Sequence, residues 1–362
     1  MSQSGLARSN TKALILEVTG SAWIQQPGAT SEHSAHARSY IPFGSAIRTG
    51  LKGRLSLRLP NETVLNIRPD SKIVLVSRQV GQKTTRNSLV LLFGRVWSQV
   101  VKRMGGEEHY RIVTSNAVAG VRGTEFEVAV ADDGRARIYV DSGSVSVRTQ
   151  ENEALLQSGG DSIINQRGER EKETNASKQE PKWNNWFSTC RRRLKTTAPK
   201  LIQIARINVH THRVGISKIR NEQEHIVGKE KRLQSRARMG DARATQERQK
   251  LKAQLRLQKT ALFERQLLLN AQMGIVDRYA DLANDPKFGM LDRTTIIREA
   301  KFLRRLKASL DKTIQDGMDI SLKAMESLMN DMGRGKRDSL NDSKDSAVDE
   351  MFGPDKGRLD IP

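Results

Sequence analysis

Tyr110 to Val130 reads YRIVTSNAVAGVRGTEFEVAV, and this segment sets the pattern for the N-terminal half of the chain. From Glu125 to Val130 the large apolar residues occupy every second position, with two glutamates and an alanine at the positions between. This alternation predicts a strand with one buried face. Gly123 interrupts the alternation just before Thr124. A glycine at such a place predicts a bulge or a close approach of two backbones.

Short runs of the same kind recur before and after this segment. They are Leu14–Val18, Ala22–Gln25, Ala46–Arg48, Leu55–Leu59, Val64–Ile67, Lys72–Val76, Leu89–Leu92, Arg95–Val100, Tyr110–Thr114, Thr124–Val130, Ala136–Val140 and Ser144–Arg148. Turn residues separate the runs, and Asp133-Gly134 predicts a hairpin. The spacing predicts a mainly β domain, either an antiparallel β-sandwich of jelly-roll-like form or a short β-helix.

The central segment resembles the signature of the FecR-type domain, a bacterial envelope module named after a regulator of ferric citrate uptake. The family pattern is T-x-x-A-x-x-x-V-R-G-T-x-F-x-V. The residues that fall on it are Thr114, Ala117, Val121, Arg122, Gly123, Thr124, Phe126 and Val128. We interpret Thr114, Arg122, Gly123, Thr124 and Phe126 as a structural signature. Arg122 is expected to be a buried, paired arginine, with surface recognition as the alternative role.

Further blocks match the family in the same order. They are Pro42–Gly50, Leu55–Thr63, Leu91–Trp97 and Val140–Val145. The resemblance extends over about residues 12–165. It implies a domain that binds an envelope protein or a glycan, and a link to signal transduction, including regulation of sigma factors and iron uptake.

The composition indicates one compact part and one solvated part. The chain has 362 residues, of which 36% are hydrophobic and 4% aromatic, and both fractions are low for a protein of this length. Its 62 basic and 41 acidic residues make a formal net charge of +21, and most of the excess lies in residues 171–334. Such a charge favours anionic partners, namely nucleic acid, lipid headgroups or an acidic protein surface. A solvated helical face without a partner is the alternative.

The C-terminal half predicts long helices. Residues 222–272 lack proline and are rich in Lys, Arg, Glu, Gln, Ala and Leu, as in a long helix or a coiled coil. The turn residues Asn284 to Gly289 and a second helix from Asp292 to about Met332 complete a predicted helical hairpin. An imperfect apolar seam runs along the first helix. Its members are Leu251, Leu255, Leu262 with Phe263, Leu267 and Met273.

These patterns divide the chain into five parts: residues 1–11 are predicted to be disordered, 12–165 form the β domain, 166–182 a linker, 183–332 the basic helical hairpin and 333–362 a disordered tail. The aromatic segment Trp183 to Phe187 is expected to pack on the β domain. An anchor at a membrane interface is the alternative.

No catalytic motif, phosphate loop or metal-ligand spacing is found in the sequence, so we expect no enzyme activity, no cofactor and no metal. His210 and His212 lie two residues apart, which is a poor spacing for chelation on a helix, and both are expected at the surface. The same holds for His33 and His36.

The first hypothesis for function is a non-enzymatic scaffold or binding protein of the cell envelope. Its β domain would bind a protein or a glycan, and its helices would self-associate or contact an anionic surface. The candidate contacts are Arg191, Arg192, Arg193, Arg236, Arg243 and Lys250. The alternatives are a FecR-like signalling regulator and a cytoplasmic nucleic-acid-associated protein. The resemblance implies the periplasm, although the first residues lack the apolar core of a secretory signal.

Overall fold

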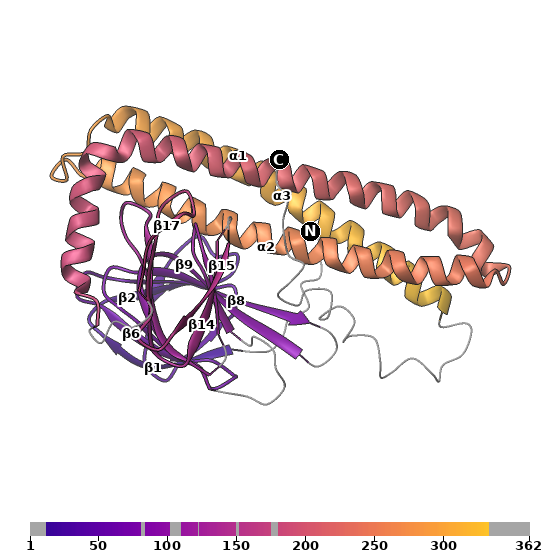
Figure 1. Ribbon diagram of the computed structural model, residues 1–362, viewed down its shortest axis with the longest axis horizontal. Coiled ribbons are helices and arrows are strands. Elements are labelled where there is room, and N and C mark those ends of the chain that lie inside the picture. Colours follow the sequence, from indigo (N-terminus) through magenta and orange to yellow (C-terminus); the bar gives the residue numbers. More distant parts are fainter. Residues whose placement is uncertain are drawn as a thin grey trace. The chain divides into compact units, whose positions relative to one another are not determined.

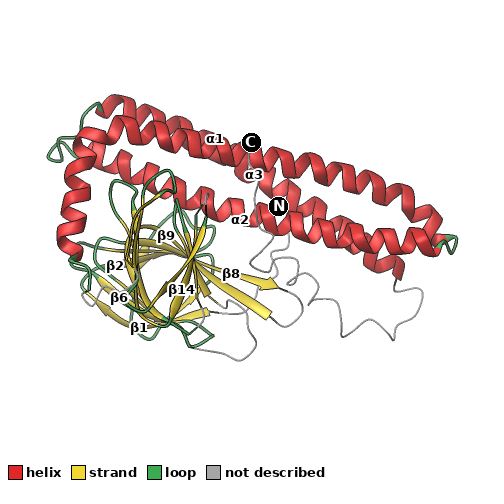
Figure 2. Ribbon diagram, viewed as in Figure 1, coloured by secondary structure: helices red, strands yellow, loops and turns green. Residues whose placement is uncertain are grey.

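A computed structural model describes residues 12–80, 84–101, 110–121, 123–149, 152–174 and 180–332. Within them the chain forms a β-rich N-terminal region followed by three long helices, as Figures 1 and 2 show. The predicted order of a mainly β part and a helical part is thereby confirmed. The segments predicted to be disordered, 1–11 and 333–362, and the signature residue Arg122 lie outside the described residues.

The elements have the following bounds. The strands are β1 (Lys12–Thr19), β2 (Ala22–Gln25), β3 (His33–Ser34), β4 (Tyr40–Pro42), β5 (Ala46–Thr49), β6 (Arg54–Arg58), β7 (Val64–Ile67), β8 (Lys72–Val80), β9 (Thr84–Gln99), β10 (Tyr110–Val113), β11 (Val118–Val121), β12 (Glu125–Val130), β13 (Ala136–Ser142), β14 (Ser144–Arg148), β15 (Glu153–Gln157), β16 (Asp161–Ile164) and β17 (Arg170–Thr174). The helices are α1 (Trp183–Arg238), α2 (Ala242–Asn284) and α3 (Arg293–Met332).

The chain divides into two compact units. Unit 1 comprises Met1–Asn208 and Leu267–Arg304, and unit 2 comprises Val209–Gln266 and Arg305–Pro362. The described strands all belong to unit 1, together with the beginning of α1, the end of α2 and the beginning of α3. The described residues of unit 2 are the remaining parts of the same three helices and the turn between α1 and α2.

The strands of unit 1 form two sheets that share β9. Sheet 1 has the order β4-β1-β6-β7-β9-β12-β13-β16-β17. Sheet 2 has the order β3-β2-β5-β8-β9-β10-β11-β14-β15. The strand β9 changes sheets at Gly94, whose φ is 94°. A Cβ atom there would lie 2.4 Å from the Cα atom of Ser71, so the crossing needs glycine.

The predicted antiparallel pairing is wrong at one place in the described strands. β9 and β10 run parallel, with Tyr110 opposite Asn87. β10 lies along the first part of β9, the part that belongs to sheet 2. The other strand pairs given above are antiparallel, and the hairpin predicted at Asp133-Gly134 joins β12 to β13.

Strand β12 is buried more completely than its alternation predicts. Phe126 and Val128 are fully buried, as expected for the inner face. However, Glu127 and Ala129 on the other face are 3% and 0% exposed. Ala129 packs against Trp183 at the start of α1, so a helix covers the face that alternation assigns to solvent.

The helical region differs from the predicted hairpin of two helices. It has three helices, because α1 ends at Arg238 and α2 begins at Ala242. Gly240 in the break has a φ of 88°, and the Asp241 carboxylate accepts the backbone N–H of Ala244 as an N-cap. The predicted turn from Asn284 to Gly289 separates α2 from α3. The predicted linker also contains a strand, β17, which pairs with β16.

Unit 2 has an apolar core of its own. The core is made by Ile226, Leu233, Ala244, Leu251, Leu255, Ala324 and Met325, which belong to all three helices. The predicted seam residues Leu251, Leu255 and Leu262 are buried. None of the described helices contains a stretch apolar enough to span a bilayer.

Candidate functional site

Four charged side chains of unit 1 meet in one group, which we name the ion cluster: Asp70, Asp132, Arg191 and Arg278. Arg278 donates Nη2–H to Asp70 Oδ2 at 2.6 Å and Nε–H to Asp132 Oδ1 at 2.7 Å. Arg191 donates Nε–H to Asp132 Oδ2 at 2.5 Å and Nη2–H to Asp70 Oδ2 at 3.3 Å. Each carboxylate therefore binds both guanidinium groups.

The ion cluster joins four elements that are far apart in the sequence. Asp70 lies in the turn between β7 and β8, Asp132 in the turn between β12 and β13, Arg191 in α1 and Arg278 in α2. The sequence predicts Arg191 as a contact to an anionic surface, and it gives no sign of a role for Arg278. No pattern in the linear sequence indicates that either arginine binds Asp70 or Asp132.

Arg278 is the most enclosed arginine of the ion cluster. Its side chain is 12% exposed, against 42% for Arg191, and its guanidinium lies 4.5 Å from the centre of the Phe93 ring. Burial lowers the pKa of Arg278, but the charges of Asp132 and Asp70 outweigh burial and raise it. Arg278 is therefore a permanent cation held between two carboxylates.

The turn that carries Asp132 also makes a direct hydrogen bond with α2. The Tyr279 hydroxyl donates to the backbone carbonyl of Asp133 at 3.0 Å, and Gln166 Nε2–H donates to the same oxygen at 2.6 Å. At Gly134, whose φ is 83°, a Cβ atom would lie 2.9 Å from the Tyr279 hydroxyl oxygen. The Asp-Asp-Gly sequence thus makes a hairpin turn and a docking surface for a helix.

Asp133 gives this turn a dependence on pH. Its side chain is 1% exposed, and burial, opposed by a hydrogen bond from the Arg135 N–H, raises its pKa to about 6. Since an unfolded aspartate titrates near pH 4, the folded chain holds the proton more tightly. The free energy of unfolding should therefore fall by about 2–3 kcal/mol as the pH rises from about 4 to about 6.

The variant Asp133→Asn isolates this effect, because asparagine keeps the acceptor for the Arg135 N–H and does not titrate. The difference in the free energy of unfolding between variant and wild type should grow in favour of the variant from pH 4 to pH 6. Urea denaturation followed by tryptophan fluorescence measures it. A constant difference across this range contradicts the prediction.

A second contact region of unit 1 surrounds Trp183, the first residue of α1. Trp183 is 5% exposed and packs on Ala129 and Tyr139. Its ring centre lies 5.0 Å from the guanidinium carbon of Arg95 and 5.5 Å from that of Arg137. The prediction that the aromatic segment packs on the β domain is confirmed. The interface-anchor alternative is not supported, because the Trp183 ring is enclosed.

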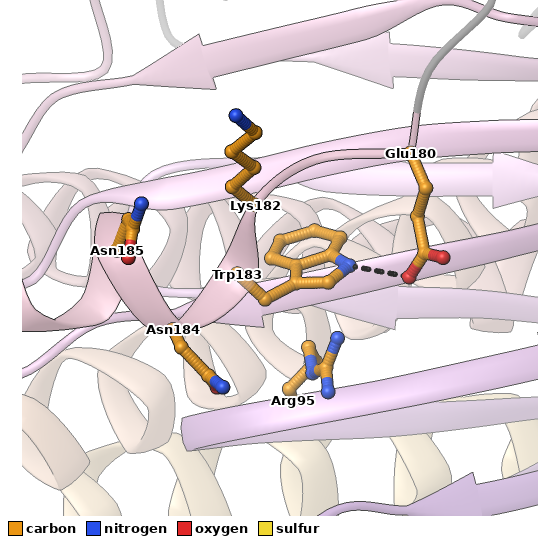
Figure 3. A pocket seen from close by; sticks show the side chains of 6 residues that line it. All are labelled: Arg95, Glu180, Lys182, Trp183, Asn184 and Asn185. Atoms are coloured by element: carbon orange, nitrogen blue, oxygen red, sulfur yellow. Dashed lines mark hydrogen bonds between the residues drawn. The ribbon is translucent and has the colours of Figure 1, made fainter.

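A shallow pocket of about 410 Å³ opens beside Trp183 (Figure 3). Its lining residues are Arg95, Glu180, Lys182, Trp183, Asn184 and Asn185. The Trp183 Nε1–H donates to Glu180 Oε1 at 3.1 Å. The lining combines both signs of charge with amide groups, and it contains no nucleophile beside a general base.

A buried carboxylate lies near this pocket. Glu127 is 3% exposed and accepts hydrogen bonds from Arg68 at 3.1 Å and from Arg95 at 3.3 Å. Burial raises the pKa of Glu127, and the two arginines oppose that rise. The sequence does not reveal this buried carboxylate, because Glu127 follows the strand alternation as an ordinary outward-facing residue.

The described signature residues have structural roles. Thr114 is buried, and its hydroxyl bonds both the carbonyl and the N–H of Ala117 at 3.0 Å. The Thr124 hydroxyl donates to the Ser144 carbonyl at 2.8 Å, and Phe126 is fully buried. Gly123 adopts a φ of 68° between β11 in sheet 2 and β12 in sheet 1.

The remaining candidate contacts form two separate groups. Arg192 and Arg193 are exposed in the part of α1 that belongs to unit 1. Arg236, Arg243 and Lys250 are exposed in unit 2, where Arg236 Nη2 also lies 2.7 Å from Asp241 Oδ2. A role in binding an anionic surface stays a prediction for all of them.

The prediction that His212 lies at the surface is wrong. Its side chain is 4% exposed in unit 2, and burial, with the charge of Arg265 adding to it, lowers its pKa to about 4. His210, His33 and His36 are exposed, as expected. In the described part of the chain, no group of three or more His, Cys, Asp or Glu side chains could hold a metal ion.

Comparison with known proteins finds one family. Residues 45–146 match the family model described as FecR protein, which confirms the resemblance for this segment, from β5 into β14. Strands β1–β4 and β15–β17 extend the two sheets on either side of the match. No curated protein matches the chain.

Solved structures resemble the chain in part. Two crystal structures of a candidate anti-sigma factor from Parabacteroides distasonis ATCC 8503 are each 20% identical to it. Each match covers 39% of this chain and 63% of that chain, with TM-scores of 0.32 and 0.31. The match therefore leaves out more than a third of those chains.

Proposed function

We propose, from the FecR-type domain at residues 45–146, that this chain is a non-enzymatic regulator of signal transduction. The β domain binds a partner protein, and this binding changes the position of the helical segments within unit 1. The match to the FecR model favours this regulatory role over the envelope scaffold that the sequence suggested first, because FecR is the name of a regulator.

The ion cluster is the observation that carries this proposal. Strand β12 contains the end of the family signature, and the turn after it supplies Asp132, which binds Arg191 of α1 and Arg278 of α2. A displacement of this turn would break charge-assisted hydrogen bonds to both helices at once. Partner binding at the strands is thereby linked to the position of the helical segments within unit 1.

Two exposed apolar side chains mark candidate surfaces for the partner. Tyr40 in β4 is 65% exposed, and Leu155 in β15 is 56% exposed. Among the described strands, β4 pairs only with β1 and β15 only with β14. Both strands therefore offer an edge to which a segment of a partner protein can add.

The test is a comparison of transcript levels with and without the gene. A regulator requires a defined set of transcripts to change on deletion, and the wild-type gene must restore them. The double variant Asp70→Asn and Asp132→Asn keeps the shape of both side chains and should fail to restore them. The matched variant Glu17→Gln and Glu62→Gln removes two exposed carboxylates of the same unit and should succeed.

Unchanged transcripts after deletion of the gene would contradict the regulatory role. Restoration by the variant that lacks both cluster carboxylates would contradict the part assigned to the ion cluster. We also propose that the protein works in the periplasm or at the cell envelope. Fractionation of cells that express the native gene tests this location, and recovery only in the cytoplasm would oppose it.

A further inference from the structure

The end of α1 and the start of α2 carry a group of exposed basic side chains in unit 2, which we name the basic arm. Its members are Lys231, Arg232, Arg236, Arg238, Arg243, Lys250 and Arg256. Three carboxylates of the same segments are already paired, since Asp241 binds Arg236 at 2.7 Å, Glu247 binds Lys229 at 2.6 Å and Glu230 binds Arg248 at 2.7 Å. The exposed surface of the arm therefore has a large excess of positive charge.

Met239 lies at the turn of the basic arm and is 79% exposed, more than the other exposed large apolar side chains of the described residues. Gly240 follows it, and a Cβ atom at Gly240 would meet no atom within 4 Å. Nothing in the described chain covers this turn. A flexible apolar side chain thus projects into solvent between arginines on either side.

The other apolar residues of the arm are not available to a partner. Leu233, Leu251 and Leu255 are buried in the core of unit 2. Deep insertion of an amphipathic helix is therefore excluded, because its apolar face is already used. What the arm offers is positive charge and one apolar side chain at its end.

We propose that the basic arm binds the surface of an anionic phospholipid bilayer, with Met239 entering the headgroup region and the surrounding basic side chains contacting lipid phosphates. Basic residues near an anionic membrane each contribute to binding, and an apolar side chain at the boundary adds to them. Nucleic acid is less well matched, because its phosphates give an exposed methionine no contact and the arm has no aromatic side chain to stack on bases.

The charges are spaced closely enough to act together. Arg243 and Lys250 lie two helical turns apart on one face of α2, about 10 Å along the axis. That separation is close to the screening length of about 8–10 Å at physiological salt. Arg192 and Arg193 belong to unit 1 and have no part in this surface.

The experiment measures sedimentation of the full chain with vesicles of phosphatidylcholine, with and without phosphatidylglycerol. Binding should require phosphatidylglycerol and weaken as salt is added. The triple variant Lys231→Gln, Arg243→Gln and Lys250→Gln should bind about a hundredfold more weakly, at about fivefold for each residue removed. These three residues form no ion pair within the described chain, so their loss spares the fold.

The matched control removes the same charge from the same unit. The triple variant Arg305→Gln, Lys312→Gln and Lys323→Gln changes exposed residues of α3 and should bind vesicles like the wild type. A loss equal to that of the arm variant would mean that only net charge matters, and would overturn the proposal. Binding that does not depend on phosphatidylglycerol would also overturn it.

Substitutions of Met239 test whether the partner of the basic arm is a membrane or a nucleic acid. The variant Met239→Ser should weaken binding to vesicles several-fold and leave binding to a short DNA duplex unchanged. In Met239→Trp, the added tryptophan emission should shift to the blue with anionic vesicles. If Met239→Ser binds vesicles like the wild type, and the arm variant loses DNA binding instead, the arm is a nucleic-acid surface and the proposal fails.

Discussion

Replacing Arg278 by methionine is expected to lower the free energy of unfolding of unit 1 by about 3–5 kcal/mol. Methionine keeps the length of the side chain but removes the more enclosed of the two guanidinium groups that bind Asp70 and Asp132, and leaves both carboxylates with Arg191 alone. Asp132 is only 10% exposed, so water cannot fully replace the lost partner. The loss measures the cost of leaving a largely buried carboxylate with one cationic partner in place of two, rather than the net contribution of the ion pair.

Tryptophan fluorescence during chemical denaturation measures this change, because all four tryptophans of the chain lie in unit 1. Arg191→Met is the matched control. Arg191 binds the same two carboxylates but is 42% exposed, so its loss should cost about 1 kcal/mol or less. Equal losses for the two variants would contradict the prediction, and so would a wild-type stability for Arg278→Met.

Replacing Arg248 by methionine is expected to destabilise unit 2 by about 3–5 kcal/mol. Arg248 of α2 and Glu230 of α1 are 6% and 4% exposed and lie 2.7 Å apart. The substitution leaves the Glu230 carboxylate buried next to the apolar core of unit 2. The free energy of opening, measured by hydrogen exchange of the amides from 226 to 255, should fall by this amount.

The double variant Glu230→Leu and Arg248→Met should restore most of the lost stability. It replaces the buried ion pair by apolar side chains of similar size, and such replacements are often neutral or stabilising. If the double variant is as unstable as Arg248→Met alone, the unpaired Glu230 carboxylate is not the cause of the loss. The arm variant described above, in which neither residue changes, should keep the wild-type hydrogen exchange.

Local patterns predicted many elements correctly because their causes lie within a few residues. Asp133-Gly134 specifies a hairpin turn through the backbone freedom of glycine, and the turn joins β12 to β13 as predicted. Asn284 to Gly289 likewise separates two helices. The break at Gly240 could not be predicted in the same way, because residues 222–272 have a helical composition on both sides of it.

The partners of charged residues could not be predicted from the sequence. Asp70 and Arg278 are 208 residues apart, and neither has a neighbour in the chain that reveals the contact. Glu127 illustrates the same limit, since its place in the strand predicts exposure while a helix covers it. His212 was placed at the surface for the same reason. Burial of a polar side chain depends on which element packs against it.

The sequence alone determined that a β-rich part carrying a FecR-type signature precedes a basic helical part, because strand alternation, turn residues and helix composition act over short distances. Only the tertiary structure decided that β9 belongs to two sheets, that the turn of β12 and β13 binds α1 and α2 through Arg191 and Arg278, and that Met239 is exposed among basic side chains. These properties depend on contacts between distant segments, and packing and desolvation select such contacts only when the chain has folded.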